Sequence, residues 1–203
     1  MTGLWVLAHE CGHQAFSDYE LINNIVGTIF HSILLVPYHP WRITHGKHHN
    51  NTGSWDNDEV FAPATRKDYE GIELRESPLS QWWGIFVMLT VGWWPGYLIF
   101  NATGPKKYRG KNASHLSPTA VMFDAKDYWL VIQSDIALCL CFAALVGCIY
   151  QYGFLTVAKY YILPEMVVNL NLVLITYLQH TDVYMPHFRN KEWNWLRCVY
   201  DIV

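Results

Sequence analysis

Two histidine clusters near the amino terminus are the residues of this sequence best suited to chemistry. The first is His9-Glu10-Cys11-Gly12-His13. Positions i and i+4 share one face of a helix, so His9 and His13 can reach the same metal region. The same five letters also fit the zinc-protease motif, because Glu10 follows His9. On this motif alone, a membrane metalloprotease is therefore a competing interpretation.

The second cluster is His45-Gly46-Lys47-His48-His49. Spacings of three and four residues put the three imidazoles on one helical face. Pro40 suits the start of that helix, and the run from Asn50 to Gly53 suits its end. The sequence therefore predicts a helix that carries three ligand-type side chains.

The number of histidines predicts more than one metal ion. The sequence has ten, and seven of them lie within the first 49 residues. A catalytic zinc uses about three protein ligands, and nitrogen-rich sites suit iron, copper or zinc. Two ions that share about eight or nine imidazoles are the simplest use for so many.

Two further histidines lie near the carboxyl end. His180 follows an apolar run, where a helix end would meet water, and we interpret it as a metal ligand, with a structural cap as the alternative. His187 follows Pro186 in a polar tail, and we expect a structural role for it.

The composition indicates which kind of protein must position these side chains. The chain is 52% hydrophobic and 16% aromatic, and only 15% of it is charged. Soluble domains carry about 25% charged residues, and tryptophan and tyrosine gather at membrane–water interfaces. The net charge of -3 comes with no basic stripe, which argues against nucleic acid as a partner. The five cysteines have no framework spacing, which argues against a disulfide scaffold.

Four stretches are apolar enough to be membrane helices, and a span needs about 20 residues. They are residues 21–38, 82–100, 128–150 and 154–178. Residues 21–38 lie between the two histidine clusters. If both clusters bind one metal centre, they lie on the same side of the membrane, so this stretch cannot cross it once. Trp93, Trp94 and Pro95 interrupt the second stretch. We therefore expect 21–38 and 82–100 to be interfacial helices.

The polar segments 39–81 and 101–127 are both rich in lysine and arginine, which places both in the cytosol. Residues 128–150 and 154–178 then form a helical hairpin that turns at 151–153 and returns His180 to the cytosolic face. Asp135 and Glu165 should face its interior, and Pro164 should kink its second arm. The predicted fold class is all-α: an integral membrane helical bundle, present in part, with a cytosolic histidine cap.

Four segments of the sequence resemble one family of enzymes, the microsomal oleate (Δ12, ω-6) fatty acid desaturases. The segment from Trp5 to Tyr19 is similar to their first histidine box. The segment from Val36 to His49 is similar to their second. Asn51-Thr52-Gly53 and Asp58-Glu59-Val60-Phe61 resemble the stretch after it. The run from Leu174 to Thr181, with Pro186-His187, resembles the stretch before their third box.

The resemblance implies a four-helix membrane fold in the endoplasmic reticulum, with the histidine boxes in the cytosol. It implies two iron ions, O2 as co-substrate, and electrons from cytochrome b5. The implied reaction makes a cis double bond in an acyl chain of phosphatidylcholine or acyl-CoA, converting oleoyl to linoleoyl. The implied iron ligands are His9, His13, His45, His48 and His49, with His180 as an additional one.

One departure from the family pattern limits this interpretation. No H-x-x-H-H cluster follows His180, and the helices that precede the first box in the family are missing. We therefore expect a fragment that is inactive alone.

Three alternatives to the Δ12 assignment stay open. The chain could come from an ω-3 desaturase or a related hydroxylase or epoxygenase. It could be a non-catalytic truncated partner in a homo- or heterodimer, or it could be a membrane zinc protease.

The predicted topology can be tested through three glycosylation sequons, at Asn50, Asn101 and Asn112. The predicted layout places all three in the cytosol, so none should carry glycan. Treatment of the protein from microsomes with an endoglycosidase should leave its gel mobility unchanged. A mobility shift that disappears on substitution of one of these asparagines would contradict the layout.

Overall fold

The computed structural model describes residues 1–61, 70, 77–181, 184, 186–189 and 191–202, with the backbone alone for 199–202. These residues form helices, turns and one isolated parallel bridge between Ser54 and Phe188. The chain divides into two compact units. The first comprises residues 1–46 and 110–168, and the second comprises residues 47–109 and 169–203. The confirmed fold class is an all-helical protein with candidate membrane spans.

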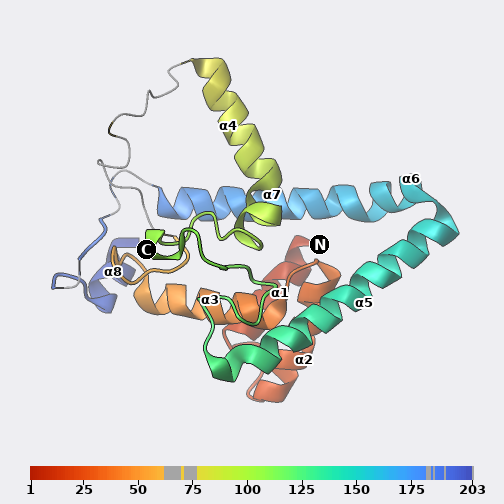
Figure 1. Cartoon of the computed structure of the whole chain (residues 1–203), viewed down its shortest axis with the longest axis horizontal. Coiled ribbons are helices and arrows are strands. Elements are labelled where there is room, and N and C mark those ends of the chain that lie inside the picture. The colour runs from red at the N-terminus through yellow and green to blue at the C-terminus, as the bar shows by residue number, and fades with distance from the viewer. Residues whose placement is uncertain (62–69, 71–76, 182–183, 185, 190, 203) are drawn as a thin grey trace. The chain divides into compact units, whose positions relative to one another are not determined.

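The first unit contains the amino-terminal helices and the hairpin. Helix α1 packs on α2, and α2 packs on α5 (Figure 1). The elements are α1 (Thr2–Gly12), α2 (Glu20–Ile33), the first part of α3 (Tyr38–Asn51), the 3-10 turn η4 (Ala125–Asp127), α5 (Tyr128–Tyr152), α6 (Phe154–Val157), the π-helix η5 (Ala158–Ile162) and the first part of α7 (Leu163–His180).

The second unit contains the remaining parts of α3 and α7 together with shorter elements. These are α4 (Pro78–Val91), the π-helical turn η2 (Gly92–Tyr97), the 3-10 turn η3 (Lys106–Tyr108) and α8 (Trp195–Ile202). Residues 62–69 and 71–76 of the first polar segment lie outside the described residues.

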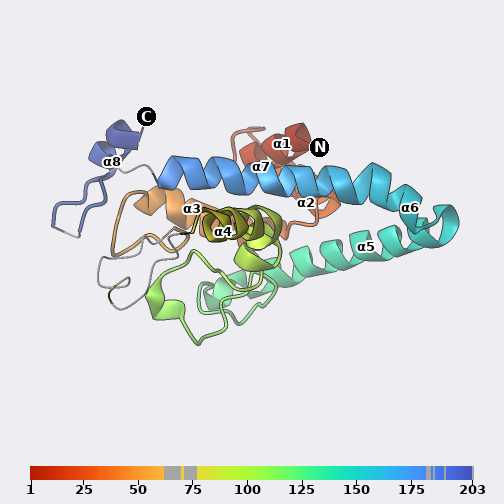
Figure 2. The same cartoon turned by 90° about the horizontal axis from the view of Figure 1, so that it is seen from above.

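Two helices are long and apolar enough to cross a membrane, Ala125–Tyr152 and Phe154–His180. They are joined at Gly153, whose φ of +82° is accessible to glycine at little cost. Figure 2 shows α5 and α6 meeting at this turn. A third span would be possible if the bent pair α2 and α3 counted as one.

The second arm of the hairpin has an irregular segment close to Pro164. The backbone widens into the π-helix η5 just before that proline, in a form that commonly accommodates a missing backbone N–H. Glu165 is buried, and Asp135 is half-buried. Neither Glu165 oxygen has a hydrogen-bond partner among the described residues.

The two predicted interfacial helices are both shorter than expected. Helix α2 ends at Ile33 rather than at residue 38, since Leu35 takes a positive φ of 55° and Pro37 disfavours helical geometry at Val36. Helix α4 ends at Val91, and the turn η2 around Pro95 follows it. Exposed apolar side chains recur at every turn of α2, a pattern typical of interfacial helices; these are Leu21, Ile22, Ile25, Ile29 and Ile33.

A single tyrosine holds together the three amino-terminal helices. Helices α2 and α3 meet at a bend of 107°, and the fully buried Tyr38 lies just after it. Its ring occupies the space where a Cβ on Gly27 would be, only 2.2 Å from the nearest ring carbon. Its hydroxyl donates to the carbonyl of Cys11 over 3.0 Å. Tyr38 therefore links α3 to both α1 and α2.

We predict that Gly27→Ala destabilises the protein by about 1–3 kcal/mol, because the added methyl group overlaps the Tyr38 ring. The control is Gly147→Ala in α5, where a Cβ would meet no atom within 4 Å. Thermal unfolding in detergent, followed by circular dichroism, should show a lower midpoint for the first variant only. Equal midpoints for the two variants would contradict this account of the core.

Candidate metal centre

Three imidazoles converge in the first unit. His9 and His13 come from the end of α1, where His13 caps the helix, and His45 comes from α3. The Nε2 atom of His9 lies 3.2 Å from that of His13 and 3.0 Å from that of His45. The Nε2 atoms of His13 and His45 are 3.2 Å apart. The two histidines of the first cluster thus meet one histidine of the second.

Hydrogen bonds alone do not explain this convergence. The Nδ1 atom of His9 lies 3.0 Å from Glu10 Oε1, and donation to that oxygen leaves the Nε2 lone pair free. Among three mutually adjacent Nε2 atoms, at least one pair must present two donors or two lone pairs. Metal–nitrogen bonds of about 2.0–2.1 Å would place neighbouring ligands of one ion about 3 Å apart. The three nitrogens therefore fit a metal ion.

Aromatic rings form the walls of this histidine group. Trp41 is stacked on His45, with ring centroids 4.4 Å apart and planes inclined by 22°. The ring of His31 meets Trp41 edge-on at 4.7 Å. Complete burial, together with the nearby His9, lowers the pKa of His31 to about 3, so this imidazole is neutral at physiological pH.

The electrostatic environment also favours the ligand form of His13. Burial and the proximity of His9 lower the pKa of His13, and the opposing effect of Glu10 is smaller. A neutral imidazole is the form that binds metal. His13 is therefore ready to act as a ligand at neutral pH.

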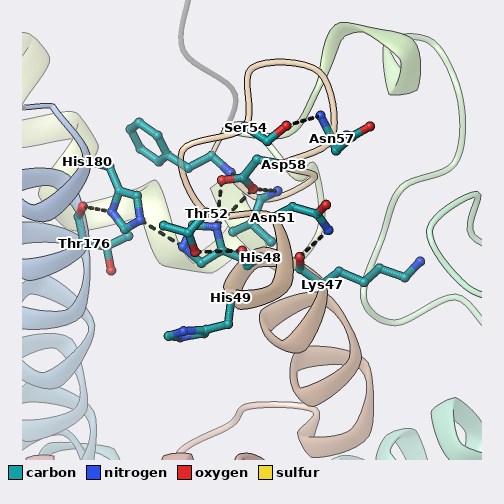
Figure 3. Close-up of polar contacts among 12 residues, drawn as sticks. Lys47, His48, His49, Asn51, Thr52, Ser54, Asn57, Asp58, Thr176 and His180 are labelled. Atoms are coloured by element: carbon teal, nitrogen blue, oxygen red, sulfur yellow. Dashed lines mark hydrogen bonds and ion pairs between the residues drawn. The ribbon is translucent and has the colours of Figure 1, made fainter. Parts of the chain in front are cut away.

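A second pair of imidazoles lies in the second unit (Figure 3). The Nε2 atoms of His48 and His180 are 2.9 Å apart. On the opposite side of its ring, His180 donates from Nδ1 to the carbonyl of Thr176 over 2.7 Å. The Nδ1 of His48 lies 2.8 and 3.0 Å from the two carboxylate oxygens of Asp58.

These contacts place a hydrogen on Nδ1 of both rings. A carbonyl or a carboxylate oxygen can only accept, so each Nδ1 carries the hydrogen. The two Nε2 atoms, on the opposite side of each ring, then face each other at 2.9 Å. A proton shared between these two nitrogens or a metal ion bound to both would satisfy the contact. Metal-bound histidines commonly have a carboxylate or a backbone carbonyl on their other nitrogen, as found here.

Two predicted residues remain, His49 and His187. His49 follows His45 by one turn of α3 and is exposed, and Figure 3 shows its ring pointing away from Asp58. His187 meets the ring of Trp55 edge-on, with centroids 6.4 Å apart. That contact is compatible with the structural role expected for His187.

Sequence reasoning missed Asp58, which is the partner of His48. Asp58 comes ten residues after His48, in a loop with no periodicity to indicate where its side chain points. Its neighbour Glu59 lies between two lysines, 2.8 Å from Lys107 Nζ and 3.5 Å from Lys47 Nζ. Burial alone would raise the pKa of Glu59, but hydrogen bonds from Lys107 and Tyr108 and the lysine charges lower it overall.

Comparisons with known proteins identify the family. The family model described as fatty acid desaturase matches residues 1–200. The chain is 43% identical to a Delta(12) fatty acid desaturase of Mortierella isabellina, over 97% of this chain and 52% of that protein. It is 41% identical to an endoplasmic reticulum omega-6 fatty acid desaturase of Brassica juncea, over 97% and 51%. It is 39% identical to an acyl-lipid (9+3)-(E)-desaturase of Dimorphotheca sinuata, over the same shares.

The chain spans about half the length of these relatives. No solved structure matches it. A family model that covers nearly the whole chain, together with convergent imidazoles at its histidine motifs, leads to one conclusion: this chain belongs to the fatty acid desaturase family.

Proposed function

We propose that the protein inserts a cis double bond into a membrane acyl chain, converting oleoyl to linoleoyl. The observation that carries the proposal is the meeting of His9, His13 and His45 through their Nε2 atoms in a chain of this family. Relatives named Δ12 and ω-6 desaturases support the choice of substrate.

We assign the iron ligands as His9, His13, His45, His48, His49 and His180. The convergent nitrogens of the first unit and the facing Nε2 atoms of His48 and His180 support five of these positions. His49 is included because it lies one turn from His45 in the same helix. When bound, two iron ions and O2 would supply the oxidant that an unactivated C–H bond requires.

The protein's own residues would supply orientation. Glu10, Asp58 and the Thr176 carbonyl hold the Nδ1 sides of the rings and leave the Nε2 atoms for the metals. The exposed apolar stripe of α2 would lie on the bilayer, next to helix α1 and its histidines. An acyl chain of phosphatidylcholine or acyl-CoA could then reach the site from the lipid.

The cellular setting follows from the same proposal. We place the protein in the endoplasmic reticulum membrane with the histidines in the cytosol, 128–150 and 154–178 as spans, and 21–38 and 82–100 at the interface. Helices α5 and α7 support the spans, and relatives named for the endoplasmic reticulum support the location. Cytochrome b5 is the proposed electron donor, and a homo- or heterodimer is compatible with the proposal.

A different acyl product is the second candidate. The Dimorphotheca relative bears the name of an (E)-desaturase at 39% identity, close to the 41–43% of the Δ12 enzymes. Sequence identity of about 40% therefore does not distinguish the position or the geometry of the double bond that an enzyme makes. An ω-3, hydroxylase or epoxygenase product remains an alternative on the same grounds.

We predict that the purified full-length protein binds about two iron ions and that His45→Ala lowers the iron content. Loss of one of three converging nitrogens leaves the ion short of ligands. Elemental analysis by mass spectrometry measures the iron, and His187→Ala is the control that should keep it. Zinc in place of iron would favour the metalloprotease interpretation.

We predict that the full-length protein, expressed in yeast that lacks linoleate, produces linoleate and that His48→Ala abolishes the product. The substitution removes one of the two nitrogens that meet in the second unit. Gas chromatography of fatty acid methyl esters measures both outcomes. A new hydroxylated, epoxidised or trans product would replace the Δ12 assignment, and activity in the variant would remove His48 from the ligand set.

A further inference from the structure

Asp58 is a loop residue whose carboxylate contacts a histidine of the candidate centre. Both carboxylate oxygens lie within 3.0 Å of His48 Nδ1, and the side chain is almost fully buried. The backbone N–H groups of Val60 and Phe61 donate to the same carboxylate, over 2.9 and 3.2 Å. These donors leave the carboxylate little freedom to rotate, so His48 faces an acceptor held in place.

The same loop also contacts the second imidazole of the pair. Phe61 lies against the ring of His180, with centroids 4.8 Å apart and planes inclined by 35°. The hydrogen bond from the Phe61 N–H to Asp58 couples the position of that ring to the carboxylate. Residues 58–61, here called the Asp58 loop, therefore contact both members of the His48–His180 pair. Figure 3 shows Asp58 beside His48.

We propose that Asp58 is the positioning residue of the metal centre: it fixes His48 as the Nδ1–H tautomer and aims its Nε2 lone pair at the metal. This inference rests on the proposed function, since it takes His48 as a metal ligand. Carboxylates in this position raise the basicity of the ligand and orient its ring. The Asp58 loop thereby sets the geometry of two ligands that come from helices far apart in the sequence.

A neighbouring carboxylate provides a matched control. Asp56 belongs to the same turn, but its Oδ1 lies 3.7 Å from the guanidinium of Arg189, which is mostly exposed. Substitution of Asp56 by asparagine removes the same charge two residues away. A general electrostatic effect of the turn on the metal would appear in both variants, and a positioning effect would appear only at Asp58.

The test uses the full-length protein in detergent with cobalt(II) as the probe. Titration measures the affinity, and visible absorption of the bound cobalt reports its ligand geometry. Asp58→Asn should weaken cobalt binding about 10–100-fold and alter the spectrum, since an amide also accommodates the wrong tautomer of His48. Asp58→Glu should recover part of the affinity, and Asp56→Asn should bind as the unmodified protein does.

A double-mutant cycle with His48→Ala separates positioning from a structural role. If Asp58 acts through His48, Asp58→Asn should cause no further loss of affinity once His48 is gone. An equal loss in both backgrounds would overturn the inference, as would an unchanged affinity and spectrum in Asp58→Asn. Loss of helical circular dichroism in both Asp58 variants would also overturn it. Failure of the unmodified protein to bind metal would overturn the proposed function, and the inference with it.

Discussion

Three of the imidazoles that meet in this chain, His9, His48 and His180, are oriented by hydrogen bonds on the far side of the ring. Glu10, Asp58 and the Thr176 carbonyl each take one Nδ1–H. The Nε2 atoms of these rings then lie about 3 Å from neighbouring imidazole nitrogens. The fold thus gathers nitrogen atoms of the type that binds iron, copper or zinc.

The helices exist in this arrangement because apolar and small residues fix their packing. Tyr38 fills the space above Gly27 and hydrogen-bonds to the end of α1, so the start of α3 is fixed against the helix that carries His9. Gly153 reverses the chain between two apolar helices. Neither Tyr38 nor Gly153 is a candidate metal ligand. Tyr38 nevertheless links the start of α3 to α1.

Local periodicity made much of this predictable from the sequence. The i and i+4 spacing of His9 and His13 survives in the structure even though His13 lies just beyond the helix, since side-chain direction changes little over one turn. The turn at residues 151–153 was also predictable from the sequence, because a glycine between two apolar runs indicates a turn. The fold class and the family followed from such local patterns.

The rest depended on contacts between distant residues. The end of α2 at Ile33 follows from a positive φ at Leu35, a conformation that hydrophobicity does not indicate. Asp58 is a partner of His48 because a loop folds back on its helix, and loops have no period that would reveal this. The partner of His180 is 132 positions away in the sequence, so only the folded chain shows which histidine it meets.

The stacking of Trp41 on His45 has an optical consequence. An indole in face-to-face contact with an imidazole ligand is well placed to lose its excited-state energy to a paramagnetic ion bound by that ligand. The emission of Trp41 would therefore change when such an ion binds at His45. The ring that packs against this imidazole would then serve as a fluorescent reporter.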